Sequence, residues 1–284
     1  MCQAETVNIR YGMTFEQRHL SRMLEVAVVS ARLGGQRAME LVNYCKVTVK
    51  NNSELVTDAD KQCQHIIIDR IKENYPDHGF IGEEGPDGKL LKQPPRSNEP
   101  VWWVIDPIDG TTNYAHRILC FNVSIAVMYE GKPIAGVVFD PTTDSMFTAV
   151  KGGDAQFNTT RIKTGEESIN EFACFGVDSH VKNNYPRGIT ETMKRTRFRN
   201  IGSMALHLAY VAKGSMIGTS GLEAKLWDIA AGSFIIEQAG GIVTNCEGEN
   251  IWPVDVEKYN GEKFSIIAAN KKAHAEIMKL MKPS

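Results

Sequence analysis

Apolar side chains recur at helical spacing in two stretches near the start of the chain. In residues 14–42, apolar positions three and four residues apart predict a long amphipathic helix, which Gly34-Gly35 is expected to weaken or bend in its later part. In residues 57–74, Ile67, Ile68 and Ile71 recur at the same spacing, and a proline follows shortly after the stretch. Two helices are therefore expected before residue 75.

Strand-like apolar runs dominate the next part of the chain. Strands are predicted over residues 79–82, 101–105, 122–129, 133–139 and 146–150. The intervening residues 86–100 are rich in Pro, Gly, Lys and Ser and predict an exposed loop. Pro107 is expected to stop the strand that delivers Asp106, because proline cannot donate to a sheet ladder.

Strands and helices alternate after about residue 155. Strands are predicted over residues 172–177, 242–244 and 265–269, and helices over 205–213, 226–239 and 271–281. No internal repeat is visible in the sequence. The pattern predicts an α/β protein in stacked layers, with an α+β N-terminal half (1–155) and an α/β C-terminal half (156–284).

Composition narrows the class of protein. The 284 residues carry 32 Lys plus Arg against 34 Asp plus Glu, and hydrophobic residues make up 42%, as in ordinary globular proteins. No long basic run is present, so no nucleic-acid partner is expected. An apolar stretch of about 18 residues is also missing, as is a secretory signal, so we expect a cytoplasmic protein without a membrane partner. The six cysteines form no Cys-x-x-Cys pair, which predicts reduced thiols.

One segment carries the strongest chemical signal. It is Trp103-Val104-Ile105-Asp106-Pro107-Ile108-Asp109-Gly110-Thr111-Thr112-Asn113. An apolar strand delivers Asp106, and a turn lets Asp109 point into the same volume. Two close carboxylates repel unless a cation lies between them, and hard oxygen ligands favour magnesium. Gly110-Thr111 then opens a helix whose first N–H groups suit an anion. Metal ligands beside a phosphate cradle are what phosphoryl transfer needs, although an isolated Asp-x-x-Asp is most often a capped turn.

Two other acidic segments are weaker signals when taken alone. Gly82-Glu83-Glu84-Gly85 follows a short strand, and a Glu-Glu pair in that position is usually a solvated loop. Trp227-Asp228 begins an apolar helix, where an aspartate is more often a helix cap than a metal ligand. Because both segments occur together with Asp106 and Asp109, in this order along the chain, a functional interpretation of each is favoured.

Together these segments resemble the inositol monophosphatase family of magnesium-dependent, lithium-sensitive phosphatases. The resemblance covers essentially the whole chain and includes Asp58-Ala59-Asp60, Gly202-Ser203 and the Gly240-Gly241 helix end. It implies a layered αβαβα sandwich, a phosphoric monoester hydrolase acting on a small phosphate monoester, two to three Mg²⁺ per subunit, and a homodimer.

The resemblance also implies roles for individual residues. Glu83, Asp106 and the Ile108 carbonyl would bind a first magnesium ion, Asp106, Asp109 and Asp228 a second, and Glu83 would help to hold a third. The Gly110 and Thr111 amides would receive the phosphate, and the Thr111 hydroxyl, with Glu83 and Asp60, would orient the attacking water. Substrate contacts are expected from Gly110, Thr111, Gly202, Ser203 and Glu223.

The sequence departs from the family pattern at the substrate side. Members that act on inositol phosphate typically carry a Glu seven residues before the Trp-Asp aspartate, where this chain has Gly221, with Glu223 two residues later. Inositol as the substrate is therefore in question. Histidinol-phosphate phosphatase and sugar (bis)phosphate phosphatase remain alternatives within the superfamily. A non-catalytic regulator that binds metal and a phosphate ligand, or RNA-associated partners, is the alternative of another class.

Overall fold

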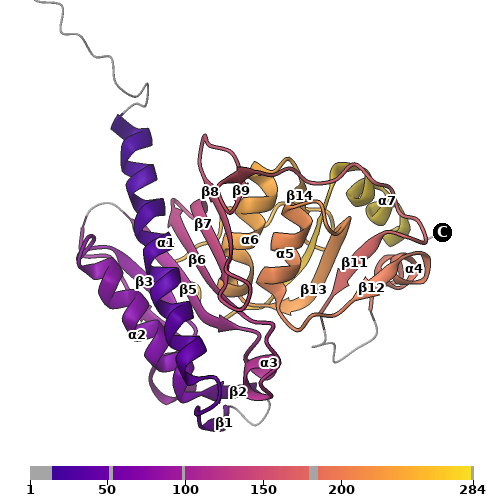
Figure 1. Cartoon of the computed structure of the whole chain (residues 1–284). Helices are drawn as coiled ribbons and strands as arrows, with labels where there is room; N and C mark the ends of the chain where they lie inside the picture. Colours follow the sequence, from indigo (N-terminus) through magenta and orange to yellow (C-terminus); the bar gives the residue numbers. More distant parts are fainter. Residues whose placement is uncertain (1–14, 51–53, 98–99, 179–184, 283–284) are drawn as a thin grey trace, which may run out of the picture.

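Five alternating layers of helices and sheets stack across the molecule. The computed structural model describes residues 15–50, 54–97, 100–178 and 185–282. A helix pair, an eight-stranded sheet, a second helix pair, a five-stranded sheet and a third helix pair follow one another (Figure 1). The predicted αβαβα sandwich is confirmed.

The first layer consists of α1 (Phe15–Leu41) and α2 (Asp58–Lys72), as the apolar spacing predicted. The Gly34-Gly35 pair does not interrupt α1. A Cβ at Gly34 would lie 2.6 Å from the Cδ1 of Ile67 on α2, and one at Gly35 would lie 2.8 Å from the Phe139 ring. The two glycines therefore let α1 approach both its partner helix and the sheet closely.

The eight-stranded sheet forms the second layer. In spatial order its strands are β10 (Thr160–Arg161), β9 (Gln156–Phe157), β8 (Ser145–Val150), β7 (Lys132–Asp140), β6 (Asn122–Tyr129), β5 (Val101–Asp109), β3 (Gly79–Gly82) and β4 (Leu91–Gln93). Only the β3–β5 pair is parallel. Strand β5 is buried along its whole length because helices cover both faces of the sheet, which explains its continuous apolar run.

Two helices fill the space between the sheets. They are α5 (Met204–Ala212) and α6 (Leu226–Gln238), and nearly all of their side chains are buried. Their apolar residues join Val104, Ala126 and Ile266 from the two sheets in one core. Helix α6 lies so close to β7 that a Cβ at Gly136 would be 2.8 Å from the Ala231 carbonyl oxygen. The two halves of the chain therefore share their largest core.

The five-stranded sheet and its covering helices complete the sandwich. In spatial order the strands are β12 (Arg197–Arg199), β11 (Cys174–Val177), β13 (Gly218–Ala224), β15 (Phe264–Ala269) and β14 (Ile242–Thr244). Helices α4 (Arg187–Arg195) and α7 (Lys271–Met281) cover the outer face. Their contacts with the sheet form a smaller core around Phe175, Ile189 and Ile277.

Several elements differ from the sequence expectations. The predicted exposed loop over residues 86–100 contains a short 3-10 helix, η1 (Pro86–Gly88), and the edge strand β4. The hairpin of β1 (Val47–Lys50) and β2 (Glu54–Thr57), together with α4, β12 and β13, was not predicted. These segments are short or rich in polar residues, so their order comes from sheet pairing and docking rather than from a local apolar pattern.

The sheet topology shows where the chain passes from one sheet to the other. Strands β9 and β10 still belong to the eight-stranded sheet, so the chain changes sheets after Arg161. The division at residue 155 stays a prediction. No helix among the described residues has the length and apolar character needed to cross a bilayer.

Candidate metal and phosphate site

Strand β5 continues past Pro107 through an irregularity that positions two aspartates. Asp106 pairs with Ser124 and Asp109 with Asn122, so two intervening residues on β5 face only one on β6. This one-residue excess is a β-bulge, and it corrects the expectation that the strand stops before Asp106. The Ile108 N–H donates to the Asp106 Oδ1 atom at 3.0 Å, which fixes the turn between the two carboxylates.

Asp109 is held by donors from distant segments. Its Oδ2 atom accepts from the Ser203 hydroxyl at 2.6 Å, the Ala205 N–H at 2.7 Å and the Asn122 amide at 3.1 Å. Ser203 is also the N-cap of α5, because its Oγ accepts from the Leu206 N–H at 3.1 Å. Burial raises the pKa of Asp109, while these hydrogen bonds oppose the rise. The serine thus ties the start of a core helix to the end of β5.

Asp228 lies in the first turn of α6. Its Oδ2 atom accepts from the Lys225 N–H at 2.6 Å, so it caps the helix as the sequence suggested, but from the third helical position. The Asp106 carboxyl lies near enough to act on the pKa of Asp228, which it lowers by hydrogen bonding. Two ionised carboxylates repel each other, so this contact requires a shared proton or a cation between them. Burial and the charge of Asp109 raise the pKa of Asp228 to about 8.

Asp60 is a buried carboxylate with one unpaired oxygen. Its Oδ2 atom accepts from the Thr57 N–H at 2.9 Å and the Thr57 hydroxyl at 2.6 Å, which caps the start of α2. Its Oδ1 atom is buried without a hydrogen-bond partner. Burial is the main cause that raises the pKa of Asp60 to about 7, and the charge of Glu84 adds to it. A buried oxygen of this kind is suited to a proton or a hard cation.

The acidic residues act on one another as a cluster. The pKa of Asp106 is raised first by burial and then by the charges of Glu83, Asp109, Asp228 and Asp60. Glu83 follows β3, and its N–H donates to the Ile105 carbonyl at 3.3 Å. Its neighbour Glu84 is buried. Across the described residues, no three His, Cys, Asp or Glu side chains already converge as the ligands of a single ion. What links the predicted ligands in this structure is the effect of their charges on the pKa of Asp106.

The chemistry of this donor set fits Mg²⁺. The donors are hard oxygens, from carboxylates and the Ile108 carbonyl, and Asp60 offers an orphaned oxygen. After burial, the largest charge effects on Asp106 all come from other carboxylates. A divalent cation would relieve the Asp106–Asp228 repulsion and neutralise the buried charge. Cysteine and histidine are missing from the set, which makes zinc a poor fit.

The helix start that the sequence analysis expects to receive the phosphate adjoins the cluster. Gly110, at φ +96°, caps α3 (Thr111–Ala115), and the Thr111 hydroxyl donates to the Ile108 carbonyl at 3.1 Å. The Asn113 amide donates to the carbonyls of Cys120 and Ile201 at 2.7 and 2.8 Å. These bonds tie the loop after β5 to the segment before α5. The structure thus brings Gly110 and Thr111 close to Gly202 and Ser203.

Gly202 is required where these two segments meet. Its φ is +76°, and a Cβ there would lie 2.6 Å from the Asn113 Nδ2 atom. A side chain at this position would be strained by its backbone conformation and would also push against the cradle. The glycine therefore permits the close approach of the α5 start to the phosphate loop.

Comparison with known proteins identifies the family. The family model described as "Inositol monophosphatase family" matches residues 19–284. This chain belongs to the inositol monophosphatase family. Among curated relatives, Nus factor SuhB of Escherichia coli (strain K12) is 36% identical over 235 residues, covering 80% of this chain and 86% of that protein. Inositol-1-monophosphatase of Rhizobium meliloti (strain 1021) is 33% identical over 237 residues, covering 80% and 87%.

Solved structures share the fold of this inositol monophosphatase family member. The extragenic suppressor protein suhB from Bartonella henselae superposes with a TM-score of 0.82 at 30% identity, covering 93% of this chain and 99% of that chain. An IMPase/NADP phosphatase complexed with Mg²⁺ and phosphate superposes with a TM-score of 0.77 at 23% identity, covering 94% and 97%. At that identity the second similarity shows the fold alone.

The substrate side differs from what the family resemblance implies. Gly221 pairs with Ile266 at the start of an irregularity in the β13–β15 ladder, and a Cβ there would lie 3.0 Å from the Met204 sulfur. A side chain at this position would require the Met204 side chain to shift. Glu223, the expected substitute, forms an ion pair with Lys263 at 2.5 Å. Its role as a substrate contact stays a prediction, as do the roles of the other site residues.

Sequence reasoning missed some of the residues that support the site. Asn122 was treated only as the start of a strand, yet its amide contacts both Asp109 and Ser203. Gln64 brackets the backbone of Glu84, accepting from its N–H at 3.0 Å and donating to its carbonyl at 2.5 Å. A local signal existed for Thr57, because Thr-x-x-Asp before an apolar run resembles a capping box.

Proposed function

We propose that this chain is a magnesium-dependent phosphatase that hydrolyses a small phosphate monoester by means of a bound water. The observation that carries the proposal is the buried Asp106, on which the charges of Glu83, Asp109, Asp228 and Asp60 act, beside the start of α3. Such a cluster is costly without cations, and a phosphate monoester brings further negative charge to the same place. Membership of a phosphatase family supports the assignment.

Each residue has a defined task in this proposal. Glu83, Asp106, Asp109, Asp228 and the Ile108 carbonyl would hold two to three Mg²⁺ ions. Those ions, when bound, lower the pKa of a coordinated water and neutralise charge on the phosphoryl group.

The chain supplies positioning around the phosphate. The N–H groups of Gly110 and Thr111 lie at a helix start, where they have no intrahelical partner and suit the phosphate oxygens. The Thr111 hydroxyl and Glu83 would orient the water, and the orphaned Asp60 oxygen would serve behind them as a proton acceptor. No covalent enzyme intermediate is needed.

Phosphate release tests the proposal. The assay uses inositol-1-phosphate, histidinol phosphate, fructose-1,6-bisphosphate, 3′-phosphoadenosine phosphate and glycerol-2-phosphate, each with and without magnesium. We expect magnesium-dependent release by the wild type and almost none by Asp106→Asn. Asp140→Asn is the matched control, because Asp140 is also a buried aspartate at a strand end but bonds only to the turn that follows β7. Equal release by the wild type and Asp106→Asn would refute the proposal.

The identity of the released alcohol is a finer proposal. The relation to the inositol-1-monophosphatase of Rhizobium meliloti favours an inositol-1-monophosphatase-like activity. The crowded Gly221 and the Glu223–Lys263 ion pair instead favour an alcohol that needs no carboxylate at position 221, such as histidinol or a sugar. The ranking of kcat/KM across the same panel distinguishes these two outcomes.

A regulatory role is a second candidate. Several curated relatives, including that of Escherichia coli, are named Nus factor SuhB, and such a role needs no turnover. Absence of phosphate release from every compound, in a protein that is folded and binds magnesium, would favour this candidate. We further propose that the chain forms a homodimer, which light scattering of the purified chain would test. We also propose that it is cytoplasmic.

A further inference from the structure

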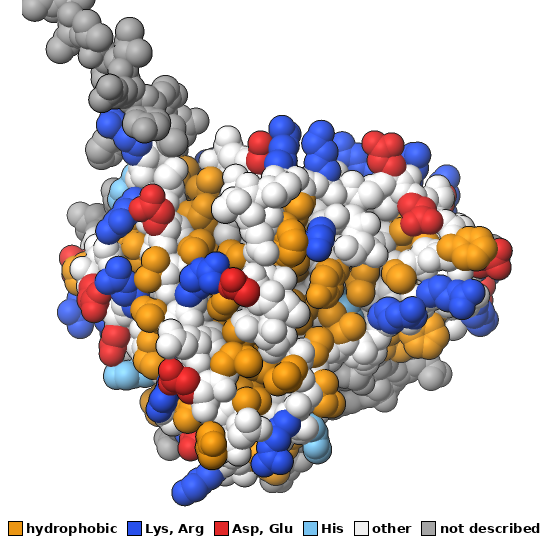
Figure 2. Space-filling model, viewed as in Figure 1, with side chains coloured by type: hydrophobic (Ala, Val, Ile, Leu, Met, Phe, Trp, Pro, Cys, Tyr) orange, Lys and Arg blue, Asp and Glu red, His pale blue; other side chains and the backbone are white. Residues whose placement is uncertain are grey.

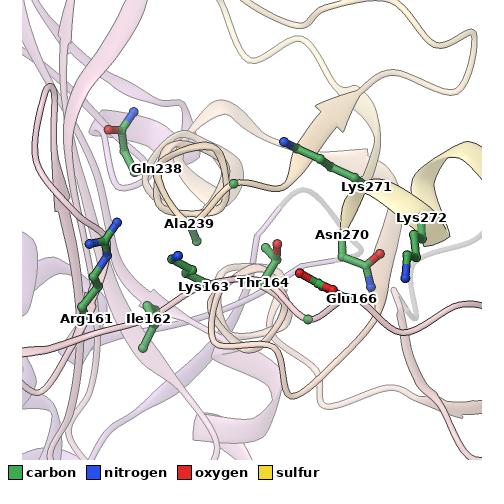
Figure 3. A pocket seen from close by; sticks show the side chains of 12 residues that line it. Arg161, Ile162, Lys163, Thr164, Glu166, Gln238, Ala239, Asn270, Lys271 and Lys272 are labelled. Carbon is green, nitrogen blue, oxygen red and sulfur yellow. The ribbon is translucent and has the colours of Figure 1, made fainter.

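A cavity lies at the C-terminal end of α6, away from the carboxylate cluster at the start of that helix. It is an open hollow of about 520 Å³ between the end of β10, the C-terminal end of α6 and the beginning of α7 (Figure 3). Asp228 lies at the third position of α6 and Gln238 at its last. Ten residues of α-helix span about 15 Å, so this cavity is separate from the proposed phosphatase site.

Basic side chains dominate the wall of the cavity. Arg161 and Lys163 approach from one side and Lys271 and Lys272 from the other, with Glu166 as the one acidic side chain of the lining (Figure 3). Basic side chains, with acidic ones between them, are also prominent along the upper edge of the molecule, where Figure 1 places β9 and β14 (Figure 2).

Most of this positive charge is not neutralised by the protein. Arg161 forms an ion pair with Asp154 at 2.9 Å. Within the described residues, no hydrogen bond or ion pair engages the side chains of Lys163, Lys271 or Lys272. Like charges around one cavity raise its potential and attract anions.

The start of α7 adds to the same potential. Asn270 caps the helix by accepting from the Ala273 N–H at 3.0 Å, so Lys271 and Lys272 occupy its first two positions. The first turn contains no acidic residue. Cations at a helix N-terminus are unfavourable, because the helix dipole is already positive there. A bound anion would offset both the lysine charges and the dipole.

One backbone hydrogen bond and one from the Asn270 side chain hold the walls in place. The Thr164 N–H donates to the Ala239 carbonyl at 3.1 Å, which fastens the segment after β10 to the end of α6. The Asn270 amide donates to the Glu167 carbonyl at 2.9 Å, which fastens the same segment to α7. The cavity is therefore formed before any ligand enters, so little conformational entropy is lost on binding.

We propose that this cavity binds a small ligand that carries two or more linked phosphate groups, such as a nucleoside di- or triphosphate. Three unpaired ammonium groups and a helix start suit several negative charges rather than one. A volume of about 520 Å³ matches a nucleotide-sized ligand and exceeds the needs of a single phosphate ion. The proposal does not depend on the phosphatase activity.

Calorimetric titration with inorganic tripolyphosphate tests the proposal. The full chain is kept in EDTA at about 0.1 M salt, so that the carboxylate cluster holds no cation and does not compete for the anion. The variant replaces Lys163, Lys271 and Lys272 with Gln, and a matched control replaces three exposed lysines elsewhere, Lys89, Lys132 and Lys151, with Gln. Melting temperatures of both variants verify the fold.

We expect tripolyphosphate to bind the wild type at least about tenfold more tightly than orthophosphate does, and the cavity variant to lose at least about tenfold in affinity. The control variant should bind like the wild type, and the cavity variant should keep its magnesium-dependent phosphate release. Absence of binding to the wild type at millimolar ligand would overturn the proposal, as would equal losses in both variants. Tight binding of single-stranded RNA without binding of tripolyphosphate would overturn it in favour of a nucleic-acid contact.

Discussion

Ser203→Ala tests whether the support around Asp109 controls the affinity for magnesium. The hydroxyl of this buried serine donates to the Asp109 carboxylate, accepts from the Asn122 amide and caps α5. Loss of a helix N-cap costs about 1 kcal/mol, and loss of a hydrogen bond to a charged group about 2 kcal/mol. We therefore expect the free energy of unfolding to fall by about 3 kcal/mol.

The magnesium dependence of Ser203→Ala distinguishes the role of Ser203 in positioning Asp109 from its role in stabilising the fold. Without the serine, the Asp109 carboxylate keeps only the Asn122 amide and the Ala205 N–H as donors and is held less firmly. The magnesium concentration for half-maximal phosphate release should therefore rise about 10- to 100-fold. The matched control is Asn270→Ala, which removes the N-cap of the remote helix α7 and should lower stability alone. Urea unfolding in EDTA gives the first quantity, and magnesium titration of phosphate release gives the second. An unchanged magnesium dependence in Ser203→Ala would refute this account of Asp109.

Three further changes probe the site. Gly202→Ala should lower both the thermal stability and the rate of phosphate release, which thermal unfolding and the phosphate assay measure. The control Gly152→Ala has a similar positive φ but nothing within 4 Å of the added Cβ, so it should cost only the backbone strain of about 1 kcal/mol. Tyr259→Phe removes the hydroxyl that accepts from the Leu226 N–H at the start of α6. The free energy of unfolding should fall by about 1–3 kcal/mol, and the magnesium concentration for half-maximal phosphate release should rise. No change in either quantity would contradict a role of Tyr259 in placing α6. In EDTA, the raised pKa of Asp60 means that the native state binds the proton of this carboxyl more tightly than the unfolded state does. The free energy of unfolding should therefore fall between about pH 4 and about pH 7, by at most about 4 kcal/mol, and then level off. Asp60→Asn should flatten this pH dependence, which urea unfolding at several pH values measures.

The layered fold was predictable where the sequence carried long apolar patterns. Helices α1 and α6 and strand β6 lie within about one residue of their expected bounds, because each buries at least one continuous apolar face. Strand β5 begins where expected and ends four residues later, at Asp109. Strand β13 was missed, because Gly218-Thr219-Ser220-Gly221 is polar and small. It is nevertheless buried between β11 and β15, where neighbouring strands satisfy its backbone. Pairing with β11 and β15, rather than a local apolar pattern, therefore makes this segment a strand.

The candidate site was predictable only in part. Asp106 and Asp109 stand out locally, since a strand and a turn place them together. The involvement of Asp60, Asp228 and Ser203 depends on contacts between segments far apart in the chain, which local spacing does not encode. Family resemblance, rather than physical reasoning from the residues, brought those positions into the prediction. The ion pair of Glu223 with a lysine on another segment was likewise out of reach.

Direct measurement of magnesium binding tests the central claim that the acidic cluster holds the catalytic cations. Isothermal titration calorimetry of the purified chain with MgCl₂ should show two to three ions per subunit in the wild type and in the control Asp140→Asn. Asp106→Asn should lose at least one of these ions, because its carboxylate is expected to bridge two of them. Equal stoichiometry and affinity in the wild type and Asp106→Asn would contradict the account.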